Sequence, residues 1–142
     1  MGLFSKLFGG TPDYPPLPPG SPLGARIHDL DEQLTELAHK VKQPLEVLPL
    51  PNAAYVFIGK PPKRFGMAWV HDGEVSGFQA LVQEQGVSPA AVEDLVTKLQ
   101  NAYSAAEDAK RFTTQVGGET VVVTDAPALT AQVDSLVREL TH

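Results

Sequence analysis

The four histidines are the first side chains to consider for metal or proton chemistry, because imidazole is the commonest metal ligand and titrates near neutral pH. His28 and His39 fall in one predicted helix, where about 16 Å of helix rise separates them, too far to bind one ion. His71 and His142 lie far from them in the sequence, and the 142-residue chain has no cysteine. We therefore predict no metal site and no cofactor.

Carboxylates are more numerous than histidines, but their spacing is that of exposed helical faces. General acid–base chemistry needs carboxylates that converge in a cleft, whereas these flank the apolar stripes of two predicted helices: Asp29, Asp31, Glu32 and Glu36 on one, Glu93, Asp94, Glu107 and Asp108 on the other. Neither a Gly-x-Ser-x-Gly nucleophile motif nor a phosphate-binding loop is present. We predict a protein that is not an enzyme and has no catalytic residues.

One basic cluster stands out in an acidic chain. Lys60, Lys63 and Arg64 lie in a predicted loop over residues 59–65, which two prolines stiffen. Such a loop presents its cations in fixed directions, as contact with an anion or an acidic partner requires. The alternative interpretation is a turn whose charges only keep it solvated.

The N-terminal segment, residues 1–10, has the pattern of a short amphipathic peptide. Leu3, Phe4, Leu7 and Phe8 gather on one side of a helical turn, and two glycines end the pattern. Burying these four side chains yields at most about 6 to 12 kcal/mol. Ordering the segment costs about 8 to 12 kcal/mol, so the peptide binds usefully only in a preformed groove or as one arm of a bivalent contact.

A proline-rich stretch over residues 11–20 follows this peptide, and half of its residues are proline. Such a stretch favours polyproline II structure, so we expect a semi-rigid linker. At about 3.1 Å per residue it would hold the peptide roughly 30 Å from the domain.

Residues 21–142 are predicted to form a single α+β domain. Ser followed by Pro begins two of its helices, and an Asp-Gly pair marks a hairpin turn. We expect an antiparallel sheet of four to five strands, built from two hairpins and covered on one face by three main helices. The expected elements are a helix over 22–43, an edge strand over 45–48, strands over 53–58 and 66–71 with a short third strand, a short helix over 77–85, a long helix from 89, a hairpin over 112–124 and a last helix after Asp125.

Composition narrows the functional classes. The hydrophobic fraction of 42% and charged fraction of 20% are those of a globular protein. A net charge of −6 argues against nucleic-acid binding, which rewards a basic surface. Since no apolar run approaches the roughly 20 residues that span a bilayer, we expect a cytoplasmic protein.

These observations predict a non-enzymatic accessory or adaptor protein, which docks onto a larger protein assembly through its N-terminal peptide and its domain. Two alternatives stay open: a small enzyme or anionic-ligand-binding domain that uses the loop from Lys60 to Arg64, and a peripheral membrane protein anchored by residues 1–8. Membrane contact is less favoured because the peptide has a single lysine. The four-three spacing of apolar residues in helix 22–43 also leaves open a homodimer seam.

Overall fold

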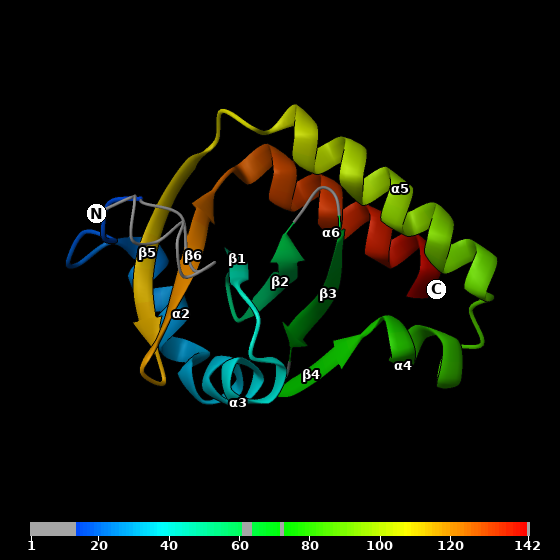
Figure 1. Ribbon diagram of the computed structural model, residues 1–142, viewed down its shortest axis with the longest axis horizontal. Coiled ribbons are helices and arrows are strands. Elements are labelled where there is room, and N and C mark those ends of the chain that lie inside the picture. Colours follow the sequence, from blue (N-terminus) through cyan, green and yellow to red (C-terminus); the bar gives the residue numbers. More distant parts are fainter. Residues whose placement is uncertain (1–13, 61–63, 72, 142) are drawn as a thin grey trace.

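The computed structural model describes residues 14–60, 64–71 and 73–141. In this part of the chain, one mixed sheet of six strands lies between two groups of helices (Figure 1). The strands are β1 (Leu45–Leu50), β2 (Ala53–Lys60), β3 (Arg64–His71), β4 (Glu74–Gly77), β5 (Lys110–Val116) and β6 (Glu119–Asp125). The helices are α2 (Pro22–Asp29), α3 (Asp31–Val41), α4 (Phe78–Gln83), α5 (Pro89–Ala105) and α6 (Pro127–Thr141).

The strand order is β4-β3-β2-β1-β6-β5, and all neighbours are antiparallel except β1 and β6. Strands β1 to β4 follow one another as a meander, and β5 and β6 form a separate hairpin. Gly117 and Gly118 close that hairpin with φ of 58° and 84°, the backbone that a tight hairpin turn requires. The expected α+β class is confirmed, but the expectation of a purely antiparallel sheet of four to five strands is wrong.

Most of the difference between the expected and the observed sheet lies in strand β1. The predicted edge strand over 45–48 is instead an inner strand between β2 and β6, and all but its last residue are buried. Pro49 is compatible with this place because the ladder to β6 pairs only Glu46 and Val47, so the proline lies beyond it. A proline therefore does not mark a sheet edge here.

The predicted helix over 22–43 is also different, because it is divided at Leu30. This residue has φ of −110° and ψ of 14°, and it separates α2 from α3. Ile27, Leu30, Leu34 and Leu37 are all buried in the domain's own core. Their four-three spacing thus reflects packing against the sheet, and these side chains are not presented to a second copy.

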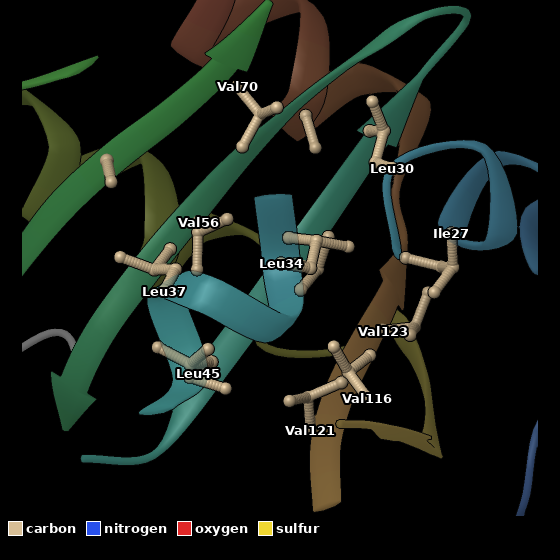
Figure 2. Close-up of a cluster of buried hydrophobic side chains, with 14 residues drawn as sticks. Ile27, Leu30, Leu34, Leu37, Leu45, Val56, Val70, Val116, Val121 and Val123 are labelled. Atoms are coloured by element: carbon tan, nitrogen blue, oxygen red, sulfur yellow. The ribbon is translucent and has the colours of Figure 1, made fainter. Parts of the chain in front are cut away.

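Helices cover both faces of the sheet, not one face as expected. In β2, Ala54 and Val56 face α2 and α3, whereas Tyr55 and Phe57 face the other helices. Since both sets are apolar, both faces must be buried. The α2–α3 face holds an aliphatic cluster (Figure 2), whose buried members are Ile27, Leu30, Leu34, Leu37, Ala38, Leu45, Val47, Ala54, Val56, Ala68, Val70, Val116, Val121 and Val123.

The second cluster joins the sheet to α4, α5 and α6 and contains the aromatic residues Tyr55, Phe57 and Trp69. The Ser88 cap predicted for the long helix is confirmed, since the Ala91 amide donates to the Ser88 hydroxyl at 3.1 Å. The expected strands in the middle of the chain, the C-terminal hairpin and the last helix are present as well.

Candidate functional site

Most of the predicted contact residues fall at or beyond the limits of the described structure. Leu3, Phe4, Leu7, Phe8 and Lys63 lie outside the described residues. The backbones of Lys60 and Arg64 end β2 and begin β3, and they pair in register at the tip of this hairpin. The loop expected over 59–65 is therefore shorter, because β2 runs to Lys60 and β3 begins at Arg64. We call this end of the β2–β3 hairpin the basic hairpin tip.

Residues 14–17 of the proline-rich stretch are hydrogen-bonded to the domain. The Leu17 amide donates to the Thr113 carbonyl at 2.8 Å, and the Thr113 amide donates to the Pro15 carbonyl at 2.9 Å. Pro16 thereby forms a parallel bridge to Thr113 on β5, the outermost strand of the sheet. Residues 14–17 are therefore part of the domain surface, so the free spacer expected over 11–20 does not extend over them. Proline lacks an N–H, but its carbonyl accepts as well as any other.

A buried carboxylate organises the centre of the α5 side of the sheet. Glu46 on β1 accepts hydrogen bonds from the Tyr103 hydroxyl at 2.6 Å, the Thr124 hydroxyl at 2.6 Å and Arg111 Nε at 3.0 Å. The guanidinium of Arg111 also lies 5.1 Å from the centre of the Tyr103 ring and donates to backbone carbonyls of Ala106, Glu107 and Ala109. We call Glu46, Tyr103, Arg111 and Thr124 the Glu46 network.

The electrostatics of this network favour the protonated forms of Tyr103 and Arg111. Burial and the Glu46 carboxylate raise the pKa of Tyr103 well above its ordinary value. Burial acts to lower the pKa of Arg111, but the neighbouring Glu46 carboxylate outweighs it, and the net direction is upward. Because Glu46 joins Tyr103 of α5 to Arg111 and Thr124 of the sheet through hydrogen bonds, the network is suited to holding α5 on the sheet.

A cavity of about 740 Å³ opens where α4 and the C-terminal half of α6 meet one end of the sheet. We call it the α4–α6 cavity. Its volume is in the range of small-molecule sites, about 300 to 1,000 Å³. Its lining includes Tyr55, Trp69, His71, Glu74, Ser76, Leu81, Glu84, Gln85, Asp134, Val137 and Arg138.

A chain of hydrogen bonds crosses the wall of this cavity. The Tyr55 hydroxyl donates to Asp134 Oδ1 at 2.6 Å, and Arg138 Nε forms an ion pair with Asp134 Oδ2 at 2.8 Å. Burial and the bond to Asp134 raise the pKa of Tyr55. The hydroxyl therefore keeps its proton and remains a donor to Asp134 at neutral pH.

An aromatic pair across two neighbouring strands lies in the same wall. Tyr55 and Trp69 are in register on β2 and β3, with ring centroids 6.4 Å apart and planes at 51°. Each is only 7% exposed, so the pair is part of the core as well as of the cavity wall.

The structure does not bring the basic hairpin tip to this cavity. Lys60 pairs with Arg64 at one end of the β2–β3 hairpin, whereas Ala53 pairs with His71 at the cavity end. At about 3.3 Å per residue, the two ends are roughly 23 Å apart. Sequence reasoning also missed Asp134, which lies 79 residues from Tyr55, a separation that leaves no local motif.

Within residues 14–60, 64–71 and 73–141, no three histidine, cysteine, aspartate or glutamate side chains are grouped so that they could hold a metal ion. The helices of the described part are all too short or too polar to cross a membrane. Comparisons with protein-family models, curated proteins and solved structures find no match to this chain.

Proposed function

We propose that this protein is a non-enzymatic adaptor, which docks onto a larger protein assembly through its N-terminal peptide and one edge of its domain. The observation that carries the proposal is the attachment of residues 14–17 to β5. This attachment supports the proposal because it fixes the point at which the peptide leaves the domain. A ligand presented from a fixed base loses less entropy on binding than one on a long free tether.

The position of that attachment also supports a second contact. Strand register pairs Thr113 on β5 with Val122 on β6, Val122 with Glu46 on β1, and Glu46 with Phe57 on β2. Thr113 and Phe57 are therefore three strand spacings apart. These spacings amount to about 14 Å, and Lys60 lies about 10 Å further along β2. Residues 14–17 lie one strand spacing outside Thr113, so the base of the peptide and the basic hairpin tip are roughly 25 Å apart, and one partner surface could contact both. Two linked weak contacts give an affinity that neither gives alone.

The main test places two charges in the apolar side of the peptide. Full-length protein with Phe4→Asp and Phe8→Asp is compared with wild type by affinity capture from source cells and quantitative mass spectrometry. We expect one discrete protein partner to be lost, with at least about a hundredfold weaker binding, because an unpaired carboxylate costs several kcal/mol to desolvate. The matched control is Ser5→Asp with Thr11→Asp, which adds the same charge to the same segment and should bind normally.

Three other outcomes would contradict the proposal. Equal capture by both double variants would show that the peptide does not dock. A lowered melting temperature of the Phe4→Asp, Phe8→Asp variant would show that the peptide belongs to the domain core. Loss of flotation with phosphatidylserine vesicles, without loss of a protein partner, would favour a membrane anchor.

The hairpin tip is tested separately by reversing Lys60, Lys63 and Arg64 to Glu. Binding of the captured partner should weaken and lose part of its salt dependence, since rim charges act mainly through long-range attraction. Reversal of the exposed Lys40 and Lys98 to Glu, compared per reversed charge, is the control for net charge. Equal effects of the two sets would remove the hairpin tip from the proposal.

A further inference from the structure

We propose that the α4–α6 cavity is a binding site for a small organic cation, an amine with an apolar body. The cavity is formed by elements that are distant in sequence: the β1–β2 turn, the ends of β2 and β3, β4, α4 and α6. It does not overlap the attachment of the N-terminal segment, which is on β5 at the opposite edge of the sheet. The proposed ligand is therefore independent of partner docking.

The charge of the lining favours a cation. Asp134 and Arg138 neutralise each other through their ion pair at 2.8 Å. Glu74 on β4 and Glu84 after α4 are exposed, and they add two carboxylates at the rim. The lining thus has three carboxylates against one guanidinium, so its ionisable residues have an excess of negative charge whatever the state of His71. An anion would meet these carboxylates, whereas an ammonium group would be attracted by them.

The hydrogen-bonding capacity of the wall points the same way. Tyr55 uses its only proton to donate to Asp134, so its hydroxyl oxygen has lone pairs left to accept. The Asp134 carboxylate is acceptor-only and is held in place by both Tyr55 and Arg138. An ammonium group has donors and no acceptors, and it therefore complements what this wall offers.

The apolar part of the cavity wall would contact the apolar body of the ligand. Trp69, Leu81 and Val137 lie beside Tyr55 in the lining. Aromatic faces attract cations as well as apolar groups, and tryptophan does so best. An amine with a ring or short aliphatic body would thus meet carboxylates at the rim and an aromatic and aliphatic wall inside.

The test uses three probes of one shape and different charge: benzylamine, benzyl alcohol and benzoate. Trp69 is the single tryptophan of the chain and lines this cavity, so tryptophan fluorescence and the indole N–H resonance report on one residue of its wall. In full-length protein at neutral pH, we expect saturable changes with benzylamine and at least tenfold weaker changes with the other two. Benzoate binding as tightly as benzylamine, or no change at Trp69 with any probe, would overturn the proposal.

Variants of the two rim glutamates test whether their charges contribute to amine binding. Glu74→Gln with Glu84→Gln should weaken benzylamine binding by about fivefold to tenfold, as expected for two partly solvated ion pairs. Glu119→Gln, an exposed glutamate at the turn between β5 and β6, should leave binding unchanged. An equal loss in the Glu119→Gln variant would show a nonspecific effect of net charge and would overturn the site. Melting temperatures of all variants establish that the fold is intact.

Discussion

Both faces of the sheet are buried, but by different kinds of side chain. The α2–α3 face is closed by isoleucine, leucine, valine and alanine side chains (Figure 2). The face under α4, α5 and α6 adds aromatic rings, the Glu46 network and the bond between Tyr55 and Asp134. Aliphatic packing is non-directional, whereas buried hydrogen bonds have fixed partners and geometry.

This difference separates two structural roles. The aliphatic face contributes stability and tolerates side chains of similar volume, as apolar cores generally do. The polar face positions α5 and α6 relative to the strands, since each buried polar group must find its partner. The α4–α6 cavity lies on that polar face, where geometry is most closely specified.

The largest expected effect comes from breaking the Glu46 network. Arg111 and Glu46 form an ion pair whose side chains are 5% and 11% exposed. Arg111→Leu leaves the carboxylate buried without its cation and should lower the free energy of unfolding by about 3 to 5 kcal/mol. Urea denaturation monitored by circular dichroism measures this loss.

Two further variants make the comparison specific. Arg111→Leu combined with Glu46→Leu should recover at least half of the loss, because an apolar pair can replace a buried ion pair at little cost. Arg138→Leu, which breaks an ion pair whose arginine is 66% exposed, should cost below about 1 kcal/mol. If Arg111→Leu were as mild as Arg138→Leu, the network would not be what holds α5 to the sheet.

An intermediate effect is expected on the aliphatic side, where α3 meets the β5–β6 turn. Gly117 has φ of 58°, and a Cβ atom at this position would lie 2.5 Å from Thr35 Cγ2. Gly117→Ala should therefore cost about 2 to 3 kcal/mol through backbone strain and steric overlap. Thermal unfolding followed by circular dichroism measures this change.

Gly118 gives a matched control for the same turn. Its φ is 84°, but no atom lies within 4 Å of its added Cβ, so Gly118→Ala introduces strain alone. Adding Thr35→Ser to Gly117→Ala removes the overlapping methyl group and should recover the difference between the two glycine variants. No recovery would mean that α3 does not pack closely on the turn.

A smaller effect than that of Gly117→Ala is expected for the two buried tyrosines of the polar face. Tyr55→Phe and Tyr103→Phe each remove one hydrogen bond to a carboxylate and should cost about 1 to 2 kcal/mol at pH 7. Burial raises the pKa of both hydroxyls in the folded protein. The stabilisation is therefore fully present below the unfolded value of about 10 and declines as pH rises above it.

Urea midpoints between pH 8 and pH 11.5 measure that decline. Each tyrosine should contribute a slope of up to about 1.4 kcal/mol per pH unit above pH 10, which the corresponding phenylalanine variant removes. An unchanged slope in the Tyr55→Phe, Tyr103→Phe double variant would show that neither hydroxyl is protected by burial.

The elements were largely predictable from local pattern, whereas their arrangement was not. Strand β2 combines β-branched and aromatic residues, and the Asp72-Gly73 and Gly117-Gly118 pairs mark turns. The parallel pairing of β1 with β6 leaves no such local signal, because it joins segments far apart in the chain. The continuous apolar character of residues 45–50 is the one clue that β1 is covered on both faces, and Glu46 and Pro49 obscure it.

The same contrast between local pattern and three-dimensional arrangement holds for the candidate sites. The basic cluster could be proposed from the sequence because Lys60, Lys63 and Arg64 are close neighbours along the chain. Both polar groupings were missed, since Arg111 and Tyr103 meet Glu46 only after the sheet has formed. A carboxylate in the middle of an apolar strand is a signal that could have drawn attention to Glu46, because such a charge needs a buried partner.

The position of Glu46 has a consequence for synthesis of the chain. Thr124, its partner on β6, lies 78 residues further along, so β1 leaves the ribosome long before its second neighbour exists. During that interval the nascent β1–β4 meander exposes β1 as an open edge, the kind of strand on which aggregation begins. An inward-pointing charge discourages pairing with another chain. We therefore expect Glu46 to hinder such pairing until Arg111 neutralises its charge and Thr124 donates a hydrogen bond to it.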